Sequence, residues 1–357
     1  MTEVPSDVDN RAVPLPGGDD SGLKRPTAIV TIQRRGEISE DGKNALIIRS
    51  PPFYMEGKVS YAVAEDSAAL GTLDVEIYNL GDDIIGQLDP NGLIKVEAGY
   101  ENDDLPKPQA IFFGVLNYAI PITKGVERVW SIHATTVASR FSLVVPYSVR
   151  TAFIGDIVQT LARSIGAEVR MPPIAFTEVA RVDDFTATAS VEEEITQLVR
   201  RLSDVTGISY LIRSRLEQPH SWDVVSATSE EDNLVLLIDE DLQTVYNSAP
   251  SPMQGEARID AQLPAGIEAP LQAADADGNI TSFEHHMTLA LDPRLSIGMW
   301  VNAVRSKPDP DDANSRVIIR STLFFLKALT IGFGGDEWMT DIKGPIIGAD
   351  ILTSGGA

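Results

Sequence analysis

Hydrophobic and polar residues alternate between Leu73 and Thr136, in four consecutive segments separated by turn-forming residues. The segments read LDVEIYNL, LIKVEAGY, AIFFGVLNYAI and ERVWSIHAT. In the first of them, the apolar residues Leu73, Val75 and Ile77 occupy every second position. Side chains of a β-strand point alternately to its two faces, so each strand has one buried and one wet face. The pattern predicts an antiparallel sheet that is solvated on one side.

Two shorter runs of β-type composition, 28–33 and 45–49, precede these segments. They end at a Ser-Pro-Pro break at 50–52, where proline excludes a central strand. Together with the four segments they give about six strands, which is enough to close a small barrel. Residues 1–24 combine prolines, glycines and acidic groups with few large apolar side chains, so burial cannot offset their ordering entropy. We expect a flexible arm there.

The hydrophobic period then changes from two residues to about 3.6, which is typical of helices. Apolar residues within 153–165 lie on one helical face, and Gly166 follows as a C-terminal stop. A second helix is predicted from Ser190, which forms a capping box with Glu193, to Gly207. The runs ISYLIR and SWDVVSA then alternate as a hairpin, so we expect a small α+β domain after the first sheet.

The segment 234–278 is rich in proline and alanine and shows no clear period, so we expect an extended crossover. Strand patterns resume in ITSFEHHMTLAL, LSIGMWVNAV and SRVIIRSTLFFL and near EWMTDIKG. They predict a second β-domain over 279–344, with pieces of 234–262 as further candidates for it. The expected fold class is therefore mainly β with an α+β insertion.

The charge balance is strongly acidic. The chain has 29 basic and 52 acidic residues, which gives a formal net charge of −23. A surface that grips nucleic acid needs cations facing the phosphates, so this balance argues against specific nucleic-acid binding. Two interpretations stay open: the charge provides solubility, or it forms an acidic wall that repels nucleic acid passing along it.

Cysteine is absent, which excludes disulfides and thiolate metal sites. The first residues, MTEVPSDVDN, lack the basic and apolar regions of an export signal. The apolar stretch LFFLKALTIGF is too short to span a bilayer and contains a lysine. We therefore expect neither an export signal nor a membrane anchor.

The stretch DADGNI copies the start of a calcium loop, because Asp275, Asp277 and Asn279 place oxygen atoms at the spacing that such loops use. The twelfth loop position, normally a bidentate glutamate, falls at His286, which favours a simple polar turn. His285 and His286 are neighbours in a predicted strand, so they point to opposite faces and cannot chelate one ion together. The sequence predicts no metal site and no cofactor.

Candidate residues for nucleophilic catalysis are few. Without cysteine, a serine or threonine would need a histidine as its base, and no histidine accompanies a nucleophile-elbow pattern. The histidines are His133, His220, His285 and His286. Acidic clusters at 82–83, 103–104 and 192–194 lie at turns or helix starts, where solvation and the helix dipole account for them. No catalytic residue is predicted; a cell-wall hydrolase, which needs two carboxylates across a cleft, is a minor alternative.

Aromatic residues fall within the predicted strands of both β-domains. They are Tyr78, Tyr100, Phe112, Phe113 and Trp130 in the first and Trp300, Phe324, Phe325 and Trp338 in the second. Aromatic side chains dominate cores and interfaces, so we interpret these as core or subunit contacts. A carbohydrate-binding platform is the alternative.

Three motifs of the first sheet, taken in order, resemble the opening barrel of phage baseplate hub proteins. They are the strand EIYNL at 76–80, the turn AGY at 98–100 and the strand IFFGVL at 111–116. This family includes the late control protein D group and the hub-like half of type VI secretion spike proteins. The helix pair at 152–207 is similar to the insertion that follows this barrel, and 295–301 with Trp-Met-Thr at 338–340 resembles the closing barrel.

The resemblance covers 25–344 in order and implies two tube-like antiparallel β-barrel domains with a small helix-helix-hairpin domain between them. The expected divisions are a flexible N-terminal arm at 1–24, the first barrel at 25–142, the α+β insertion at 143–233, the extended crossover at 234–278, the second barrel at 279–344 and a C-terminal tail at 345–357. No triple-stranded spike repeat follows Ile342, so we expect any spike to be a separate protein.

The resemblance also implies a function. It predicts a non-enzymatic baseplate hub of a phage tail, a homotrimer whose barrels form a pseudo-sixfold ring between a hexameric tail tube and a threefold central spike. The implied partners are the tail tube protein, the central spike protein, baseplate wedge or tail-fibre proteins and a tape-measure protein. DNA would pass through the lumen without specific binding, and the implied location is the virion, after assembly in the bacterial host cytoplasm. A carbohydrate- or receptor-binding β-protein of the tail tip is the alternative, and no individual interface residue is singled out.

Overall fold

The structure of the chain is a computed structural model. It describes residues 26–34, 45–62, 70–81, 84, 86, 88–89, 91–101, 107–136, 142–208, 210–216, 220–226, 235–252, 272–274, 280–309, 316–335 and 337–351. The arm expected at 1–24 and the DADGNI residues at 275–279 lie outside this set.

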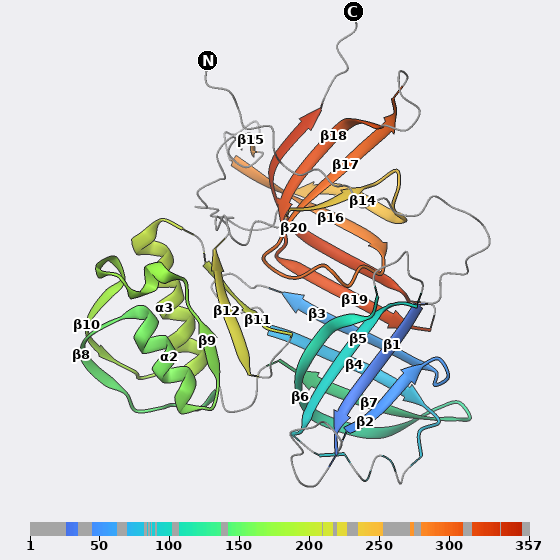
Figure 1. Ribbon diagram of the computed structural model, residues 1–357, viewed down its shortest axis with the longest axis horizontal. Coiled ribbons are helices and arrows are strands. Elements are labelled where there is room, and N and C mark those ends of the chain that lie inside the picture. Colours follow the sequence, from blue (N-terminus) through green and yellow to red (C-terminus); the bar gives the residue numbers. More distant parts are fainter. Residues whose placement is uncertain are drawn as a thin grey trace, which may run out of the picture.

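The described residues form a mainly β protein with two α-helices, which confirms the coarse fold class. One sheet of 15 strands runs through both predicted β-domains. Its main path has the order β13-β17-β18-β20-β19-β3-β4-β7-β6-β5-β1-β2, and β16 joins β14 and β15 to β20. Figure 1 shows the two halves of this sheet, one above the other, with the helical insertion beside them. Among the described strands the pairings trace an open path and close neither half into a barrel.

The first half contains seven strands. They are β1 (Pro26–Gln33), β2 (Ala45–Ser50), β3 (Met55–Ala62), β4 (Leu70–Tyr78), β5 (Leu93–Tyr100), β6 (Gln109–Lys124) and β7 (Glu127–Thr135). All six expected strands are present, and the alternating residues Leu73, Val75 and Ile77 are buried as predicted. β3 is additional, because Gly57 interrupts the apolar residues of its buried face.

The second half is built from eight strands. They are β13 (Val235–Asp239), β14 (Val245–Pro252), β15 (Gln272–Ala274), β16 (Ile280–Ala290), β17 (Trp300–Pro308), β18 (Arg316–Phe325), β19 (Ala328–Gly334) and β20 (Met339–Ile351). β13, β14 and β15 lie within 234–278, where the sequence predicted an extended crossover. The prolines of β14 obscure its strand pattern, and proline is compatible with a strand at the edge of a sheet.

The insertion combines two helices with short strands and turns. They are β8 (Ser148–Phe153), α2 (Ile154–Ser164), β9 (Glu168–Arg170), η2 (Pro173–Phe176), η3 (Glu178–Ala180), β10 (Arg181–Thr186), α3 (Val191–Thr206), β11 (Tyr210–Ser214) and β12 (Ser221–Ser226). The predicted capping box of Ser190 and Glu193 is present, and α3 ends at Gly207 with a φ of +68°. The predicted hairpin is β11 with β12.

The small sheet β11-β12-β9 connects two cores. Trp222 and Val224 pack against the apolar faces of α2 and α3, whereas Leu211 and Val225 belong to the core of the large sheet. Successive side chains of a strand point to opposite faces, so this sheet is buried on both sides. In the part of the chain that is described, the helices are too short or too polar to span a bilayer.

Candidate assembly interface

Eight strands of the large sheet form one uninterrupted antiparallel series, β14-β16-β20-β19-β3-β4-β7-β6. Four of these strands come from each half of the chain, and the halves meet where β19 pairs with β3, from Ala328 opposite Ala62 to Gly334 opposite Glu56. Figure 1 shows β20, β19, β3 and β4 following one another across this junction. The two halves are therefore joined by a backbone ladder, which fixes their relative position.

The two faces of the eight-stranded sheet differ sharply in polarity. One face packs into the common core and carries fully buried side chains from both halves: Val59, Leu73, Val75, Ile132, Met287, Leu289, Leu329, Ile331, Phe333 and Ile342. The other face, called the polar face below, alternates with it along every strand. At the junction it carries Ser60, Thr330 and Asp341 side by side. A single solvated surface thus extends over both halves of the chain.

Carboxylates outnumber lysines on the polar face. The acidic residues are Glu56, Asp74, Glu76, Glu127, Glu284 and Asp341, and the lysines are Lys58, Lys124 and Lys343. Lys124 contacts Glu76 at 2.5 Å and Lys343 contacts Glu284 at 2.5 Å. The hydrogen bond to Glu76 raises the pKa of Lys124. The ion pairs neutralise two lysines, so the surplus charge of this face is negative.

His133 also lies on the polar face. Its Nδ1 is 2.7 Å from Oδ1 of Asp74, and its ring stacks on Tyr118 with a centroid distance of 5.2 Å. Tyr118 belongs to the second half of β6, where Ile120 is equally exposed at 47%. At its β6 edge, the polar face therefore carries two large exposed side chains, the aromatic Tyr118 and the aliphatic Ile120.

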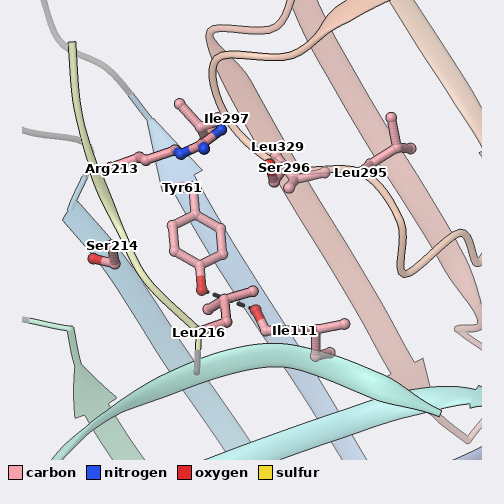
Figure 2. Close-up of a pocket in the computed structure, with 9 residues that line it drawn as sticks. All are labelled: Tyr61, Ile111, Arg213, Ser214, Leu216, Leu295, Ser296, Ile297 and Leu329. Atoms are coloured by element: carbon pink, nitrogen blue, oxygen red, sulfur yellow. Dashed lines mark hydrogen bonds between the residues drawn. The ribbon is translucent and has the colours of Figure 1, made fainter. Parts of the chain in front are cut away.

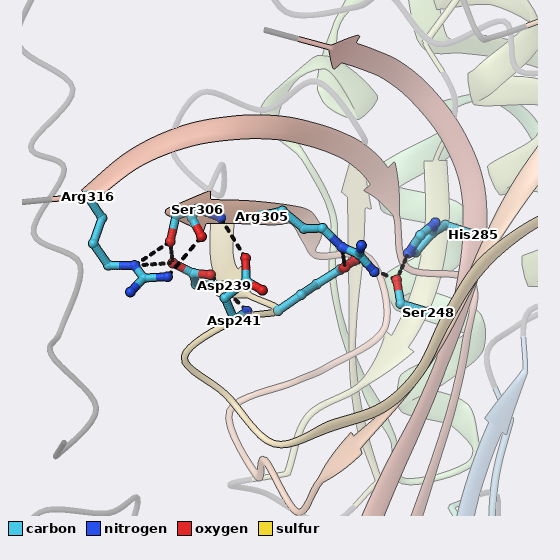
Figure 3. A network of polar contacts seen from close by, with 8 residues as sticks. Asp239, Asp241, Ser248, His285, Arg305, Ser306 and Arg316 are labelled. Carbon is cyan, nitrogen blue, oxygen red and sulfur yellow. Dashed lines mark hydrogen bonds and ion pairs between the residues drawn. The ribbon is translucent and has the colours of Figure 1, made fainter. Parts of the chain in front are cut away.

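A polar cluster holds the other end of the sheet, at the turn between β13 and β14 (Figure 3). The hydroxyl of Ser248 donates to Oε1 of Glu240 at 2.5 Å and is 2.9 Å from Nε2 of His285. Arg305 donates to Oε2 of Glu240 at 2.6 Å. These contacts connect β14 with β16 and β17, so β14 is anchored by side chains as well as by its backbone ladder.

The same cluster continues toward β18. The hydroxyl of Ser306 donates to Asp239, and its backbone N–H donates to Asp241 at 2.9 Å. Arg316 donates to the Ser306 hydroxyl at 2.6 Å. Charge-assisted hydrogen bonds of this kind are stronger than neutral ones, so the acidic turn is tightly fixed.

His285 is the buried titratable group of this cluster, with 2% of its surface exposed. Burial lowers its pKa to about 4, although nearby Glu240 acts in the opposite direction. Its Nδ1 is buried and has no hydrogen-bond partner among the residues that the structure describes, and its ring lies 5.0 Å from that of Phe324. His285 is therefore neutral at pH 7 and part of the core.

A small cavity lies where the insertion meets both halves of the large sheet (Figure 2). Its volume is about 30 Å³, and it is lined by Tyr61, Ile111, Arg213, Ser214, Leu216, Leu295, Ser296, Ile297 and Leu329. The Tyr61 hydroxyl donates to the carbonyl of Ile111 at 2.8 Å, and burial raises the Tyr61 pKa. A cavity of this size holds a water molecule, whereas ligand pockets are about ten times larger. We interpret it as a small packing defect where the insertion and the two sheet halves meet, and not as a ligand site.

The other histidines and acidic residues considered in the sequence analysis occupy positions that the local structure explains. His286 is less buried than its neighbour His285, as expected for opposite faces of β16. His220 lies in the turn before β12 with a φ of +54°. Glu194 accepts from the backbone N–H groups of Thr188 and Ala189 at 2.6 and 2.8 Å. The acidic pairs at 82–83 and 103–104 lie outside the described residues.

The acidic first turn of α3 contains one residue with a shifted pKa, Glu192. Burial, and secondly the charge of Glu193, raises the pKa of Glu192. Glu193 itself closes the capping box with Ser190. Within the described ranges no three histidine, aspartate or glutamate side chains come together in a group that could hold a metal ion.

The aromatic residues are mostly core residues. Tyr100, Phe112, Trp130, Trp300, Phe324 and Phe325 are all buried. The indole N–H of Trp130 donates to the carbonyl of Leu80, and that of Trp338 to the carbonyl of Gly335. Tyr78 packs edge-on against the exposed Tyr54. The core interpretation is thus confirmed for the six buried rings.

Sequence reasoning missed the junction strands β3 and β19 and the Glu240–Ser248–His285 cluster. A signal for β3 exists in retrospect, because Val59 and Tyr61 alternate with Lys58 and Ser60. The cluster has no such signal, since its members come from separate strands that only the fold brings together.

No model of a known protein family matches the sequence, and no curated protein matches it. Solved structures do match. A tail protein from Neisseria meningitidis MC58 aligns with a TM-score of 0.52 and 10% identity, over 89% of this chain and 96% of that chain. The 43 kDa tail protein of prophage MuSo2 from Shewanella oneidensis aligns with a TM-score of 0.51 and 10% identity, over 88% and 97%.

The chain shares its fold with these two tail proteins. A chain of the Francisella PdpA–VgrG complex in its half-lidded form also matches, with a TM-score of 0.53 and 12% identity, over 91% of this chain and 58% of that chain. The resemblance to the baseplate hub family that the sequence motifs indicated is thus confirmed at the level of the fold. Because this tail-protein fold covers nearly nine-tenths of the chain, it includes both sheet halves and the insertion.

Proposed function

We propose that the protein is a structural hub of a phage-tail baseplate. In this proposal three copies form a ring that joins a hexameric tail tube to a threefold central spike. Each chain contributes two sheet halves, so a trimer presents six of them and can match sixfold symmetry on one side and threefold symmetry on the other. The alignment with two phage tail proteins over nearly their whole length supports a structural tail role.

The observation that carries the proposal is the polar face that extends over β14, β16, β20, β19, β3, β4, β7 and β6. A sheet with one apolar and one polar face can bound a water-filled bore if copies are arranged with the polar faces inward. Such a bore requires the two halves of each chain to be held in a fixed relation, which the β19–β3 ladder provides.

The charge of the polar face suits the passage of DNA. Its carboxylates outnumber its lysines, and Lys124 and Lys343 are engaged by acidic partners. A surface of this kind offers few cations to phosphates, so DNA would pass without being retained. In this proposal the protein binds no specific nucleic-acid sequence.

The domain division belongs to the same proposal. The arm is at 1–24, the insertion is at 143–233, and the two tube-like domains are at 25–142 and 279–344, the second of which is completed by β13, β14 and β15 from the segment 234–278. The insertion packs against the apolar side of the sheet through Leu211 and Val225. In a ring whose bore is lined by the polar face, the insertion would therefore project outward. Its outer surface is the natural place for wedge or tail-fibre proteins, and the two rims of the ring for the tube and spike proteins.

The proposed location is the tail baseplate of the virion, with assembly in the bacterial cytoplasm. The proposed role is non-enzymatic, in keeping with the tail proteins that share the fold. Light scattering coupled to size-exclusion chromatography tests the oligomer, and electron microscopy of assembled tails tests the location. A trimer and a ring between tube and spike are expected. A protein that stays monomeric at all concentrations and is absent from tail particles would contradict the proposal.

A further inference from the structure

Three arginine side chains surround one aspartate on the small sheet β11-β12-β9 of the insertion. Asp223 of β12 lies opposite Arg213 of β11 and opposite Arg170 of β9. Residues directly opposite each other in paired strands point to the same side of a sheet, so these three side chains share one face. Arg215, which directly follows β11, also approaches Asp223. We call Arg170, Arg213 and Arg215 the arginine cluster.

The arginines surround Asp223 at distances longer than a hydrogen bond. The distance from a guanidinium nitrogen to a carboxylate oxygen is 3.9 Å for Arg170, 3.8 Å for Arg213 and 3.7 Å for Arg215. A charge-assisted hydrogen bond is normally about 2.7–2.9 Å long. Oδ1 of Asp223 is buried and has no hydrogen-bond partner among the described residues. Within the same residues, the side chains of Arg170 and Arg213 donate no hydrogen bond, so their N–H groups can accept a ligand.

The face that carries the arginine cluster has more positive than negative charge. Of the described carboxylates on this sheet, Asp223 and Glu168 share the face with the arginines, and Glu168 lies two residues before Arg170 on β9. Three guanidinium groups therefore face two carboxylates. The net charge of the whole chain is −23, so this face differs in sign from an average surface of the molecule and attracts anions.

Solvent reaches the arginine cluster from the β9 side of the sheet. The side chain of Arg170 is 65% exposed, whereas those of Arg213 and Arg215 are 26% and 14% exposed. Among the described strands β9 pairs only with β12, so the sheet ends at β9. An incoming chain can therefore approach along this edge. The two less exposed arginines are already held in place, so they lose little conformational freedom when a ligand binds.

The cluster lies beside the junction of the insertion with the large sheet. On the same face of the small sheet, Leu211 and Val225 pack into the core of the large sheet. Arg213 and Asp223 lie two residues away from them on the same two strands. Arg213 also lines the small cavity at this junction (Figure 2). A chain bound to the cluster would therefore contact the insertion next to its attachment to the large sheet.

Separate carboxylates fit this cluster better than phosphates do. Arg170 and Arg213 lie on either side of Asp223, on strands that are each about 4.8 Å from β12. A phosphate dianion placed between them would meet the charge of Asp223, whereas two single carboxylates can pair with the flanking arginines. Acidic side chains at alternate positions of an extended chain lie on one side, about 7 Å apart, within reach of two arginines. Nucleic acid needs a longer series of cations along its backbone.

We infer that the arginine cluster is a docking site for an acidic segment of another protein, whose aspartate or glutamate side chains pair with Arg170 and Arg213. The partner is defined by its chemistry, an extended segment with carboxylates at alternate positions. The inference rests on the proposed function in one respect, because a hub would offer its insertion to another tail protein. The site itself can be tested on the full-length chain alone.

Fluorescence anisotropy tests the site with a labelled peptide in which aspartate alternates with serine. The wild-type protein should bind this peptide at low salt, and it should not bind the same peptide with asparagine in place of aspartate. Arg170→Gln removes an exposed guanidinium group, so it should weaken binding about tenfold, the effect of losing one charge-assisted hydrogen bond. Arg213→Gln should weaken binding at least as much.

The matched control is Arg150→Gln, which makes the same change of charge at an exposed position of β8 in the same insertion. It should leave the affinity for the peptide unchanged. Thermal melting of each variant checks the fold, and Arg170→Gln decides alone if Arg213→Gln fails to fold. A wild-type protein that does not bind the acidic peptide, or an equal loss in Arg150→Gln, overturns the docking site.

Two further measurements identify the occupant. Inorganic phosphate and a single-stranded oligonucleotide should bind more weakly than the peptide; tighter binding of either, lost in Arg170→Gln, overturns the carboxylate partner. Light scattering should show the same oligomer for Arg170→Gln and wild type, because a loss of the trimer would assign the cluster to a second copy and overturn the inference. Peptide binding by a protein that never forms a trimer, alone or in tails, contradicts the hub proposal and leaves the docking site standing.

Discussion

The β19–β3 junction and the β13–β14 turn stabilise the same sheet by different means. At the junction, a backbone ladder carries apolar side chains such as Ile331 and Phe333, which are fully buried. At the turn, three consecutive acidic residues, 239–241, are fixed by arginine and serine side chains, and the cluster ends at His285. The junction should therefore be insensitive to pH, and the turn should depend on protonation.

The largest effect is expected at the junction. The ring of Phe333 covers Gly57 of β3, where an added Cβ would lie 2.1 Å from the ring. Phe333→Ala should lower the free energy of unfolding by about 3–5 kcal/mol, because it removes a buried ring and leaves a cavity. Urea denaturation measures this change. Phe53→Ala, at an exposed position, is the control and should have little effect; equal losses in both variants would refute the role of the junction.

The next effect concerns pH at the turn. The pKa of His285 is about 4 in the fold and about 6.5 when unfolded. Between these values the unfolded chain binds a proton that the folded chain does not, so stability falls as the pH is lowered from about 6.5 to about 4. The loss attributable to His285 is about 2–3 kcal/mol.

His285→Leu should remove this part of the pH dependence, which is measured as the difference in unfolding free energy between wild type and variant across pH 4–7. His286→Leu is the matched control, since His286 lies on the polar face of the same strand. An unchanged slope in His285→Leu would show that the cluster does not depend on His285.

A smaller loss is expected from the hydroxyl at the centre of the cluster. Ser248→Ala removes the hydrogen bond to Glu240 and the contact with Nε2 of His285, so both groups lose a polar partner. The cost should be about 1–2 kcal/mol by thermal or urea denaturation. Ser60→Ala on the polar face is the control with a small expected effect; a neutral Ser248→Ala would mean that the backbone ladder alone holds β14.

The smallest effect is expected for the ion pairs of the polar face. Lys124→Gln breaks the contact with Glu76, but the pair is exposed, and exposed pairs contribute little to stability. The melting temperature should stay within error of wild type at low and high salt. A clear destabilisation would show that charges, as well as the ladder to β7, hold the end of β6 that carries Lys124.

Local signals in the sequence predicted much of the fold. The alternation of apolar and polar residues around Leu73 reflects a single strand with one buried face. The capping box of Ser190 and Glu193 involves only four consecutive residues. Such features are determined within a few residues, so the sequence reveals them without knowledge of the fold.

Features that depend on distant partners were not predicted. Gly57 is required in β3 because of Phe333, which lies in the other half of the chain. β14 is a strand despite its two prolines because β16 provides its partner. The polar face needs the register of eight strands, so no local pattern could have identified it.

The central claim is that the polar face lines a ring of three copies. Electron cryo-microscopy of the purified trimer, or of tails that contain it, tests this claim most directly. We predict a threefold ring in which β3, β4, β7, β16 and β20 surround the bore and direct Asp74, Glu76 and Asp341 into it. A ring with this face turned outward, or a baseplate in which the protein forms no ring, would contradict the claim.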